Sequence, residues 1–273
     1  MSRSRIVLLG CLFWFSSQLL YGQANNKVDV LSKDQLEFLE QLTIAVLEES
    51  SIHPGQFISE VFGANNSGGL LIRPGGRNAY PSFWIRDYAM ALETDLVSLE
   101  AQKHMLLLTA KSQANQSWIT SGGSMVPVGS IADHIRIDDG LPIYFPGTYS
   151  YADQGTERWG SLPPYGDQFM FVHMAHYYVK TLGEIGILSE EINGMKLIDR
   201  LTLAFHVPPS GLDNHLVYAS DRFRGVDFGF RDAIELTGEL LYPSLLKFRS
   251  AMQLSELFEL LDRPEQSEKY KEI

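Results

Sequence analysis

Cysteine is almost absent from this sequence. Among 273 residues the one cysteine is Cys11, and it lies in the N-terminal segment that we expect to be removed. The remaining chain therefore has no disulfide and no thiolate chemistry, and its stability must come from its core.

Basic residues are also in deficit. The chain has 22 Lys and Arg against 33 Asp and Glu, which gives a formal net charge of −11. Nucleic-acid binding relies on Lys and Arg that neutralise phosphates, so this charge argues against a nucleic-acid partner. A content of 45% hydrophobic and 20% charged residues excludes disorder, collagen and coiled coil. The length allows one large domain or two small ones.

Long apolar runs are missing except near the N-terminus. Arg3 and Arg5 precede an apolar stretch at 6–15, and the small residues of Gly22-Gln23-Ala24 follow. We expect a signal peptide over 1–24 with cleavage after Ala24, and hence a secreted or periplasmic protein without membrane attachment. The stretch is shorter than the roughly 20 apolar residues of a membrane-spanning helix.

A lipoprotein signal is the alternative interpretation of this segment. In Leu8-Leu9-Gly10-Cys11, Cys11 would be lipidated and become the new N-terminus. The apolar core would then be only 6–10, shorter than the usual ~7 to 15 residues, so we prefer the signal peptide. Its removal takes away two arginines and no acid, so the net charge goes from −11 to −13.

Helical periodicity dominates the rest of the chain. Ser32 and Gln35 form a capping box for a helix that ends near Ser51. Further helices are predicted over 86–96, 98–111, 166–181, 189–205 and 243–261, and another begins at Glu265. No strand run is comparably clear. The sequence therefore predicts an all-α fold of paired helices.

Two of these helices carry specific expectations. Ser189 is the predicted N-cap of the 189–205 helix. Pro243 is expected in the first turn of the last long helix, where its missing N–H costs nothing. The apolar residues of that helix are expected to face inward: Leu245, Phe248, Met252, Leu254, Leu257 and Leu261.

The connections at 52–84 and 112–165 are long and rich in Gly, Pro, Ser, Asn and aromatics, as functional loops usually are. They contain Asn65-Asn66-Ser67 and Asn115-Gln116-Ser117, which are glycosylation sequons where the organism glycosylates. We expect a site to be built from these connections.

Carboxylates lie beside aromatic residues where loops meet predicted helices. Trp84 offers a flat apolar face, while Arg86 and Asp87 can hydrogen-bond to neighbouring sugar hydroxyls. Alternatively, Arg86 and Asp87 pair with each other and Trp84 is part of the core. Tyr165 and Asp167 form a second junction, where Asp167 is a sugar ligand or only a helix cap.

A third junction contains Asp227, Arg231, Asp232 and Glu235 in a phenylalanine-rich segment. Aromatic surroundings disfavour the charged form of an acid and raise its pKa toward that of a general acid. The alternative is a solvated turn in which arginines neutralise these acids. The fourth candidate is Asp139, in a turn before Tyr144, Phe145 and Tyr149, which form either a sugar-facing wall or only a turn.

These junctions resemble those of the six-hairpin (α/α)6-barrel glycosidases, of glucoamylase-like or debranching type. The resemblance implies an incomplete (α/α)6 toroid over 25–273, the N-terminal half of a catalytic domain whose other helices follow residue 273. It implies substrate binding by Trp84, Arg86 and Asp87, to which we add Asp139, Tyr165, Asp167, Asp227 and Arg231. It also implies a general acid, assigned to Asp232 with Glu235 second, and a base beyond Ile273.

The implied reaction is hydrolysis of an O-glycosidic bond with inversion, in which acid and base are ~6.5 to 9.5 Å apart. The expected partner is an oligo- or polysaccharide, with no cofactor, and the oligomeric state is open. Two alternatives remain: a non-catalytic or truncated glycan-binding relic, and an α/α-barrel polysaccharide lyase that uses Tyr and His on a uronate.

Other chemistries have little support. His173 and His176 are three residues apart on a predicted helix, but no third ligand lies one turn away, so we expect core or substrate-facing residues and no metal. His134 is expected in a loop network with Arg136, Asp138 and Asp139. No Gly-x-Ser-x-Gly, phosphate loop or dinucleotide motif supports a serine hydrolase or a nucleotide enzyme.

Overall fold

The computed structural model of the chain describes residues 30–59, 62–74, 80–156, 160–220 and 237–273. The chain divides into two compact units, Met1–Thr43 and Ile44–Ile273. The expected signal peptide lies outside the described residues. Within the described ranges, no helix has the length and apolar character needed to cross a membrane.

Helices form most of the regular structure. They are α2 (Lys33–Ser50), α3 (Ile85–Ala91), α4 (Leu99–Ser112), α5 (Tyr165–Leu182), α6 (Leu197–Phe205), α7 (Leu241–Leu260) and α8 (Pro264–Lys271), with short 3-10 turns η1 (Leu92–Thr94) and η3 (Ile185–Ser189). The capping box is confirmed, because the Ser32 N–H donates to Gln35 Oε1 at 2.8 Å and the Gln35 N–H donates to Ser32 Oγ at 3.2 Å.

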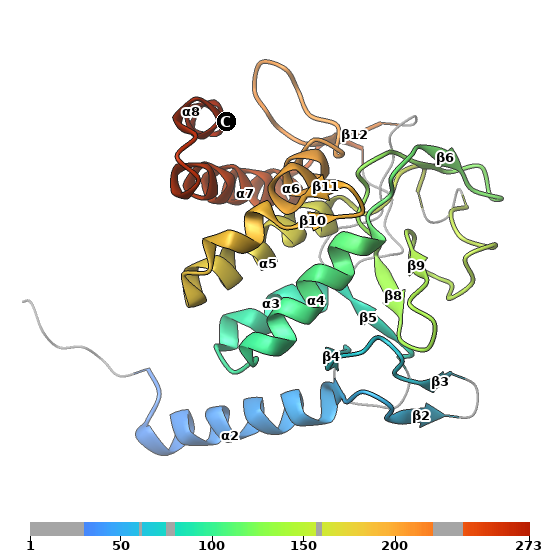
Figure 1. Cartoon of the computed structure of the whole chain (residues 1–273), viewed down its shortest axis with the longest axis vertical. Helices are drawn as coiled ribbons and strands as arrows, with labels where there is room; N and C mark the ends of the chain where they lie inside the picture. The colour runs from blue at the N-terminus through green and yellow to red at the C-terminus, as the bar shows by residue number, and fades with distance from the viewer. Residues whose placement is uncertain (1–29, 60–61, 75–79, 157–159, 221–236) are drawn as a thin grey trace, which may run out of the picture. The chain divides into compact units, whose positions relative to one another are not determined.

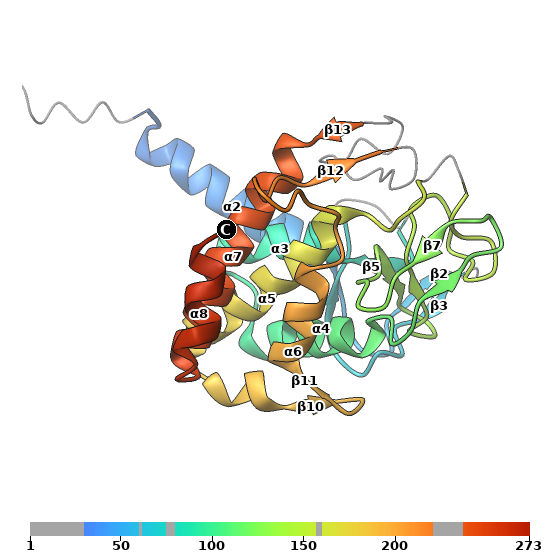
Figure 2. The same ribbon diagram turned by 90° about the horizontal axis from the view of Figure 1, so that it is seen from above.

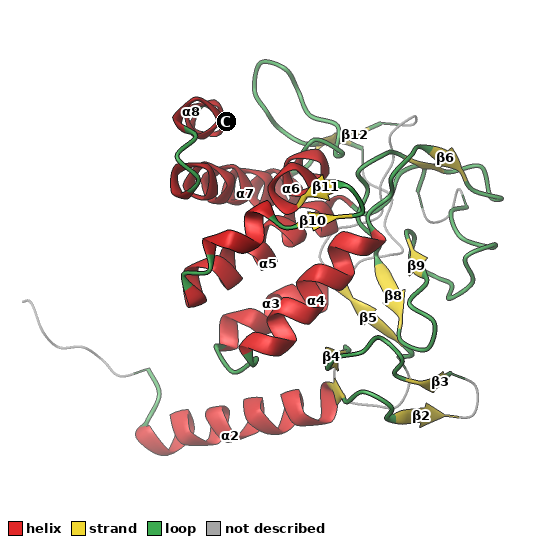
Figure 3. Ribbon diagram, viewed as in Figure 1, coloured by secondary structure: helices red, strands yellow, loops and turns green. Residues whose placement is uncertain are grey.

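The prediction of an all-α toroid is wrong, because the chain combines its helices with several small antiparallel sheets (Figure 3). The strands are β1 (Ser51–Ile52), β2 (Phe57–Ser59), β3 (Gly63–Ala64), β4 (Leu71–Ile72), β5 (Ser82–Trp84), β6 (Trp118–Ile119), β7 (Met125–Val126), β8 (His134–Arg136), β9 (Pro142–Ile143), β10 (Glu191–Ile192), β11 (Met195–Lys196), β12 (Tyr218–Ala219) and β13 (Gly238–Glu239). Each has two or three residues, too few to show an alternating pattern in the sequence.

The predicted helix from Ser189 begins too early. Residues 191–196 form the β10–β11 hairpin, and α6 starts only at Leu197. Asn193 and Gly194 form its turn with φ of 49° and 78°, a conformation that Asn-Gly adopts readily. The hairpin signal therefore outweighs the helical spacing of the apolar residues.

The fold of the second unit is organised around α5. This helix contacts α3, α4, α6 and α7, and it is buried along most of its length, as its apolar sequence predicts (Figure 1). Gly183 ends it in the left-handed conformation at φ 69°. The three-stranded sheet β5-β8-β9 leads into this helical layer, because β5 is followed directly by α3.

The expectation that α7 turns all its large apolar residues inward is wrong. Leu254 and Leu257 are buried, whereas Leu245, Phe248 and Met252 are more than half exposed. The face of α7 toward α5 includes a polar residue, Ser250, whose Oγ donates to the Phe169 carbonyl at 3.1 Å. Close packing against α5 thus selects a face that apolar spacing alone does not reveal.

This difference predicts unequal costs for one substitution on one helix. Leu254→Ala should lower the free energy of unfolding by about 2 to 5 kcal/mol, because it leaves a cavity in the core. Leu245→Ala should change it by less than about 0.5 kcal/mol, because that side chain is 57% exposed. Urea unfolding measures both, and equal losses would show that the exposed face of α7 is covered in solution.

Candidate functional site

Helices α5 and α7 run in the same direction, as can be followed in Figure 2. Ser250 on α7 meets Phe169 on α5, and Gln253 lies 2.9 Å from His173. Further along, the Glu256 carboxylate lies 3.0 Å from His176. Residue numbers rise together along the two helices, so their N-termini lie at the same end.

Helix α3 has the same direction as α5. Glu93, just after α3, lies 3.0 Å from His173, and the Tyr177 hydroxyl donates to Asp95 at 3.1 Å. The first turns of α3, α5 and α7 therefore lie at one end of the unit. We call this end the helix-start rim. It is the end at which the sequence predicted a site.

Trp84 is the last residue of β5 and the N-cap of α3, and it is partly exposed. Pairing of β5 with β8 places it opposite His134, and the two rings stack at 4.5 Å with 21° between their planes. Tyr80 and Tyr149 meet its ring edge-on at 5.3 and 5.9 Å. The indole is thus held in a fixed orientation, and it is not sealed in the core.

A buried Asp–His pair lies behind this indole. His134 Nδ1 is 2.7 Å from the Asp133 carboxylate, and His134 Nε2 is 3.0 Å from the Thr148 carbonyl oxygen. Side chains of both Asp133 and His134 are at most 2% exposed. The Thr148 carbonyl can only accept, so His134 Nε2 donates to it, while Nδ1 shares a hydrogen bond with the Asp133 carboxyl group.

Two predicted groups of site residues lie at the rim end of the unit. Arg86 is buried in the first turn of α3, where Asp87 is partly exposed. Tyr165 and Asp167 are buried in the first turn of α5. Helix N-termini favour negative charge, which stabilises both carboxylates. Burial, together with the charge of Tyr218, raises the pKa of Tyr165 well above its usual range, so its hydroxyl stays protonated.

Asp139 does not join this group. It lies in the β8–β9 turn beyond Arg136, and the register places that turn at the opposite end of the sheet from Trp84. Its carboxylate accepts from the Leu141 N–H at 3.1 Å and pairs with Arg136 at 3.1 Å. The remaining predicted residues, Asp227, Arg231, Asp232 and Glu235, lie outside the described residues.

The loop network expected around His134 is divided in two. Arg136 pairs with Asp138 at 3.0 Å, whereas His134 pairs with Asp133. Burial of Asp138 opposes ionisation, but hydrogen bonds from Arg136 and from the backbone hold its pKa below the usual value. Asp133 was missed because nothing in the sequence distinguishes its carboxylate from a loop acid.

His173 lies below the rim, between α5 and α7. It is buried, as expected, and its Nδ1 accepts from Gln253. Burial, with the charges of Arg249 and His176, lowers the pKa of His173 to about 3. A Glu93 oxygen lies 3.0 Å from His173 Nε2, but the two atoms are not aligned for a hydrogen bond. The Glu93 carboxylate is also 60% exposed, so water screens its charge and it does little to raise the pKa of His173.

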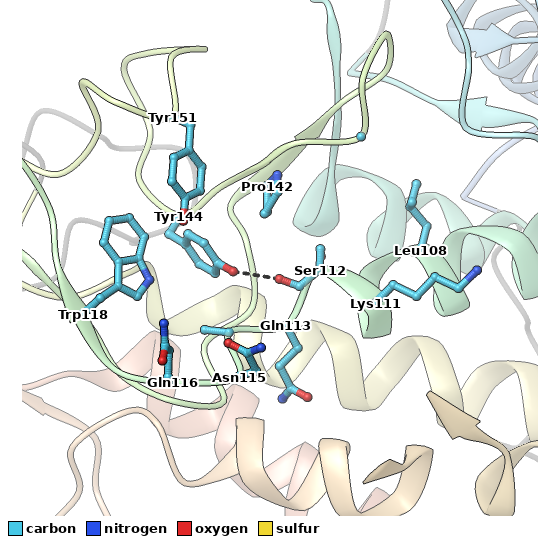
Figure 4. Close-up of a pocket in the computed structure, with 12 residues that line it drawn as sticks. Leu108, Lys111, Ser112, Gln113, Asn115, Gln116, Trp118, Pro142, Tyr144 and Tyr151 are labelled. Atoms are coloured by element: carbon cyan, nitrogen blue, oxygen red, sulfur yellow. Dashed lines mark hydrogen bonds between the residues drawn. The ribbon is translucent and has the colours of Figure 1, made fainter. Parts of the chain in front are cut away.

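A hollow that sequence reasoning missed lies between the end of α4 and the loops that follow it. Its volume is about 510 Å³, and its walls include Trp118, Tyr144 and Tyr151 (Figure 4). The signal in the sequence was the aromatic content of the 112–165 connection. That content does not say which rings meet, because Trp118 and Tyr151 are distant in the chain.

Compared with protein-family models and with curated proteins, the sequence matches none. In the part of the chain that the structure describes, no three His, Cys, Asp or Glu side chains gather as a metal site requires.

The buried pair behind Trp84 should contribute strongly to stability. Asp133→Asn should lower the free energy of unfolding by about 1 to 3 kcal/mol, because it disturbs a buried hydrogen bond to His134. Asp139→Asn is the matched control and should cost less than about 1 kcal/mol, because its pair with Arg136 is solvated. Urea unfolding at neutral pH compares the two variants, and a similar cost for both would show that the buried pair contributes no more than a solvated one.

His173 should make the folded state sensitive to acid. In the unfolded chain His173 binds a proton near pH 6.5, but in the folded chain it does so only near pH 3. The contribution of His173 to the free energy of unfolding is therefore fully present above pH 6.5 and is lost as the pH falls toward 3. The loss is about 1.4 kcal/mol per pH unit. Between pH 6.5 and 4.5, the free energy of unfolding measured in urea should therefore fall by about 2 kcal/mol less in His173→Gln than in the native chain. His53→Gln, at an exposed position, should behave as the native chain does.

Proposed function

We propose that the helix-start rim binds a saccharide and that the protein hydrolyses O-glycosidic bonds. The observation that carries this proposal is the shared direction of α3, α5 and α7, which brings Trp84, Arg86 and Asp87 to the same end as Tyr165 and Asp167. These groups are about eighty residues apart in the sequence.

The chemistry of the rim suits a sugar ring. A pyranose has an apolar C–H face and a rim of hydroxyls, so it needs a flat apolar surface next to donors and acceptors. Trp84 provides the surface, and the stack on His134 fixes its orientation. Asp87 provides a partly exposed carboxylate that accepts hydrogen bonds from hydroxyls.

The reaction follows from the resemblance to six-hairpin glycosidases in the Trp84-x-Arg86-Asp87 motif. Asp232, with Glu235 as second candidate, donates the proton to the departing glycosidic oxygen. A second carboxylate activates water on the opposite face of the sugar ring, which gives inversion. Both candidate acids precede α7 in the sequence, and the first turn of α7 belongs to the rim.

The test is release of reducing sugar from a panel of α-glucans and other glycans. Asp232→Asn should lower the rate by about 100-fold or more, because a general acid contributes at least that much. Glu265→Gln, an exposed acid on α8 after the far end of α7, is the control and should leave the rate unchanged. Unchanged activity in Asp232→Asn would assign the acid to another residue.

A saccharide-binding measurement tests the rim site independently of the hydrolytic reaction. Trp84→Ala should weaken saccharide binding by about tenfold, because loss of a stacked ring costs on the order of 1 kcal/mol or more, while Phe57→Ala should leave it unchanged. Binding by the native chain without turnover would assign a glycan-binding protein in place of a hydrolase. Release of an unsaturated product would assign a lyase.

A further inference from the structure

The hollow beside α4 is built from two stretches of chain. One runs from Leu108 at the end of α4 to Trp118, and the other from Gly140 to Tyr151. Its volume of about 510 Å³ is within the range of small-molecule sites. Figure 4 shows aromatic side chains on one side and the last residues of α4 on the other. We call this hollow the Trp118 cavity.

One wall of the Trp118 cavity is aromatic and reaches solvent. Trp118 and Tyr151 stack at 5.3 Å with 18° between their planes, and Tyr144 meets Trp118 edge-on at 6.0 Å. Tyr151 is 42% exposed and Trp118 is partly exposed. This wall therefore offers flat apolar surface to a molecule that arrives from water.

The polar groups of the Trp118 cavity are nearly all uncharged. Asn115 and Gln116 are exposed, and within the described residues their amides have no protein partner. Lys111 is the single charged side chain among the lining residues, and Figure 4 shows its ammonium group pointing away from the aromatic wall. A chain with 33 acids thus lines this hollow without a carboxylate. The cavity favours a neutral ligand.

Hydrogen bonds hold the backbone that carries the aromatic wall. Gln154 Nε2 donates to the Tyr151 carbonyl at 3.0 Å, and Gln154 Oε1 accepts from the Tyr144 N–H at 2.6 Å. Thr120, next to β6, donates to the Gly155 carbonyl at 2.7 Å. Gly155 has φ 73°, and a Cβ there would lie 2.7 Å from Thr120, so this close approach requires glycine. A preformed wall avoids the entropy cost of ordering its rings on binding.

We propose that the Trp118 cavity is a second saccharide site, which binds a neutral pyranose unit of a glycan. The C–H face of the ring stacks on the aromatic wall, and the amides of Asn115 and Gln116 hydrogen-bond to its hydroxyls as donors and acceptors. The ligand class rests on the proposed function, whereas the site rests on these residues alone. Phe145 of the expected sugar-facing wall is buried, while Tyr144 lines this cavity and Tyr149 contacts Trp84.

The experiment uses the full chain labelled with 5-fluorotryptophan. Each tryptophan gives a fluorine resonance, three in all once the expected signal peptide with Trp14 is removed, and the Trp84 and Trp118 resonances are assigned by Trp→Phe substitution. The probes are maltohexaose, cellohexaose and mannohexaose, titrated separately. At least one should shift the Trp118 resonance in a saturable way. Gln116→Ala should raise the Kd from that shift about fivefold, the loss of one or two hydrogen bonds.

Controls separate this site from the rim. Gln266→Ala removes an exposed amide on α8 and should leave the Kd unchanged. A shift of Trp84 without a shift of Trp118 overturns the second site and leaves the proposed function intact. A shift of Trp118 alone supports the second site and counts against the rim. A response of Trp118 to phenol but to none of the three sugars overturns the saccharide assignment, as does the absence of any response.

Discussion

Burial of α5 on nearly every side is the constraint on which the second unit depends. A helix with so few exposed faces must be surrounded, and α3, α4, α6 and α7 surround it. Hydrogen bonds along its length, such as those from Ser250 and Gln253 on α7, fix the direction and the register of its neighbours. The helix-start rim follows, because neighbours that run with α5 must begin where α5 begins.

The helices were predictable because they are long enough for apolar residues to recur several times. The Ser32 capping box, the buried α5 and Pro243 in the first turn of α7 were each present in local sequence. Strands of two or three residues contain little more than one repeat of an alternating pattern, so the sheets could not be found this way. The β10–β11 hairpin could have been found, since Asn193-Gly194 is a turn signal of its own, but the helical spacing of the apolar residues led to the wrong prediction of a helix.

In the candidate sites, too, only features formed by adjacent residues could be predicted from the sequence. The motif at Trp84 was visible because its three residues are adjacent, and the structure places it with Tyr165 and Asp167 at one end of the unit. The pairing of β5 with β8 stacks Trp84 on His134 and so places Asp133 behind it. The Trp118 cavity likewise joins segments that meet only after folding, and neither arrangement has a local signal in the sequence.

The segment that contains Tyr149 and Tyr151 contributes a ring to both the Trp84 surface and the Trp118 cavity. Tyr149 contacts the edge of Trp84, and Tyr151, two residues later, stacks on Trp118. The backbone between them is only one residue long, so it has little slack to absorb movement. The same short stretch thus anchors one ring of each aromatic surface.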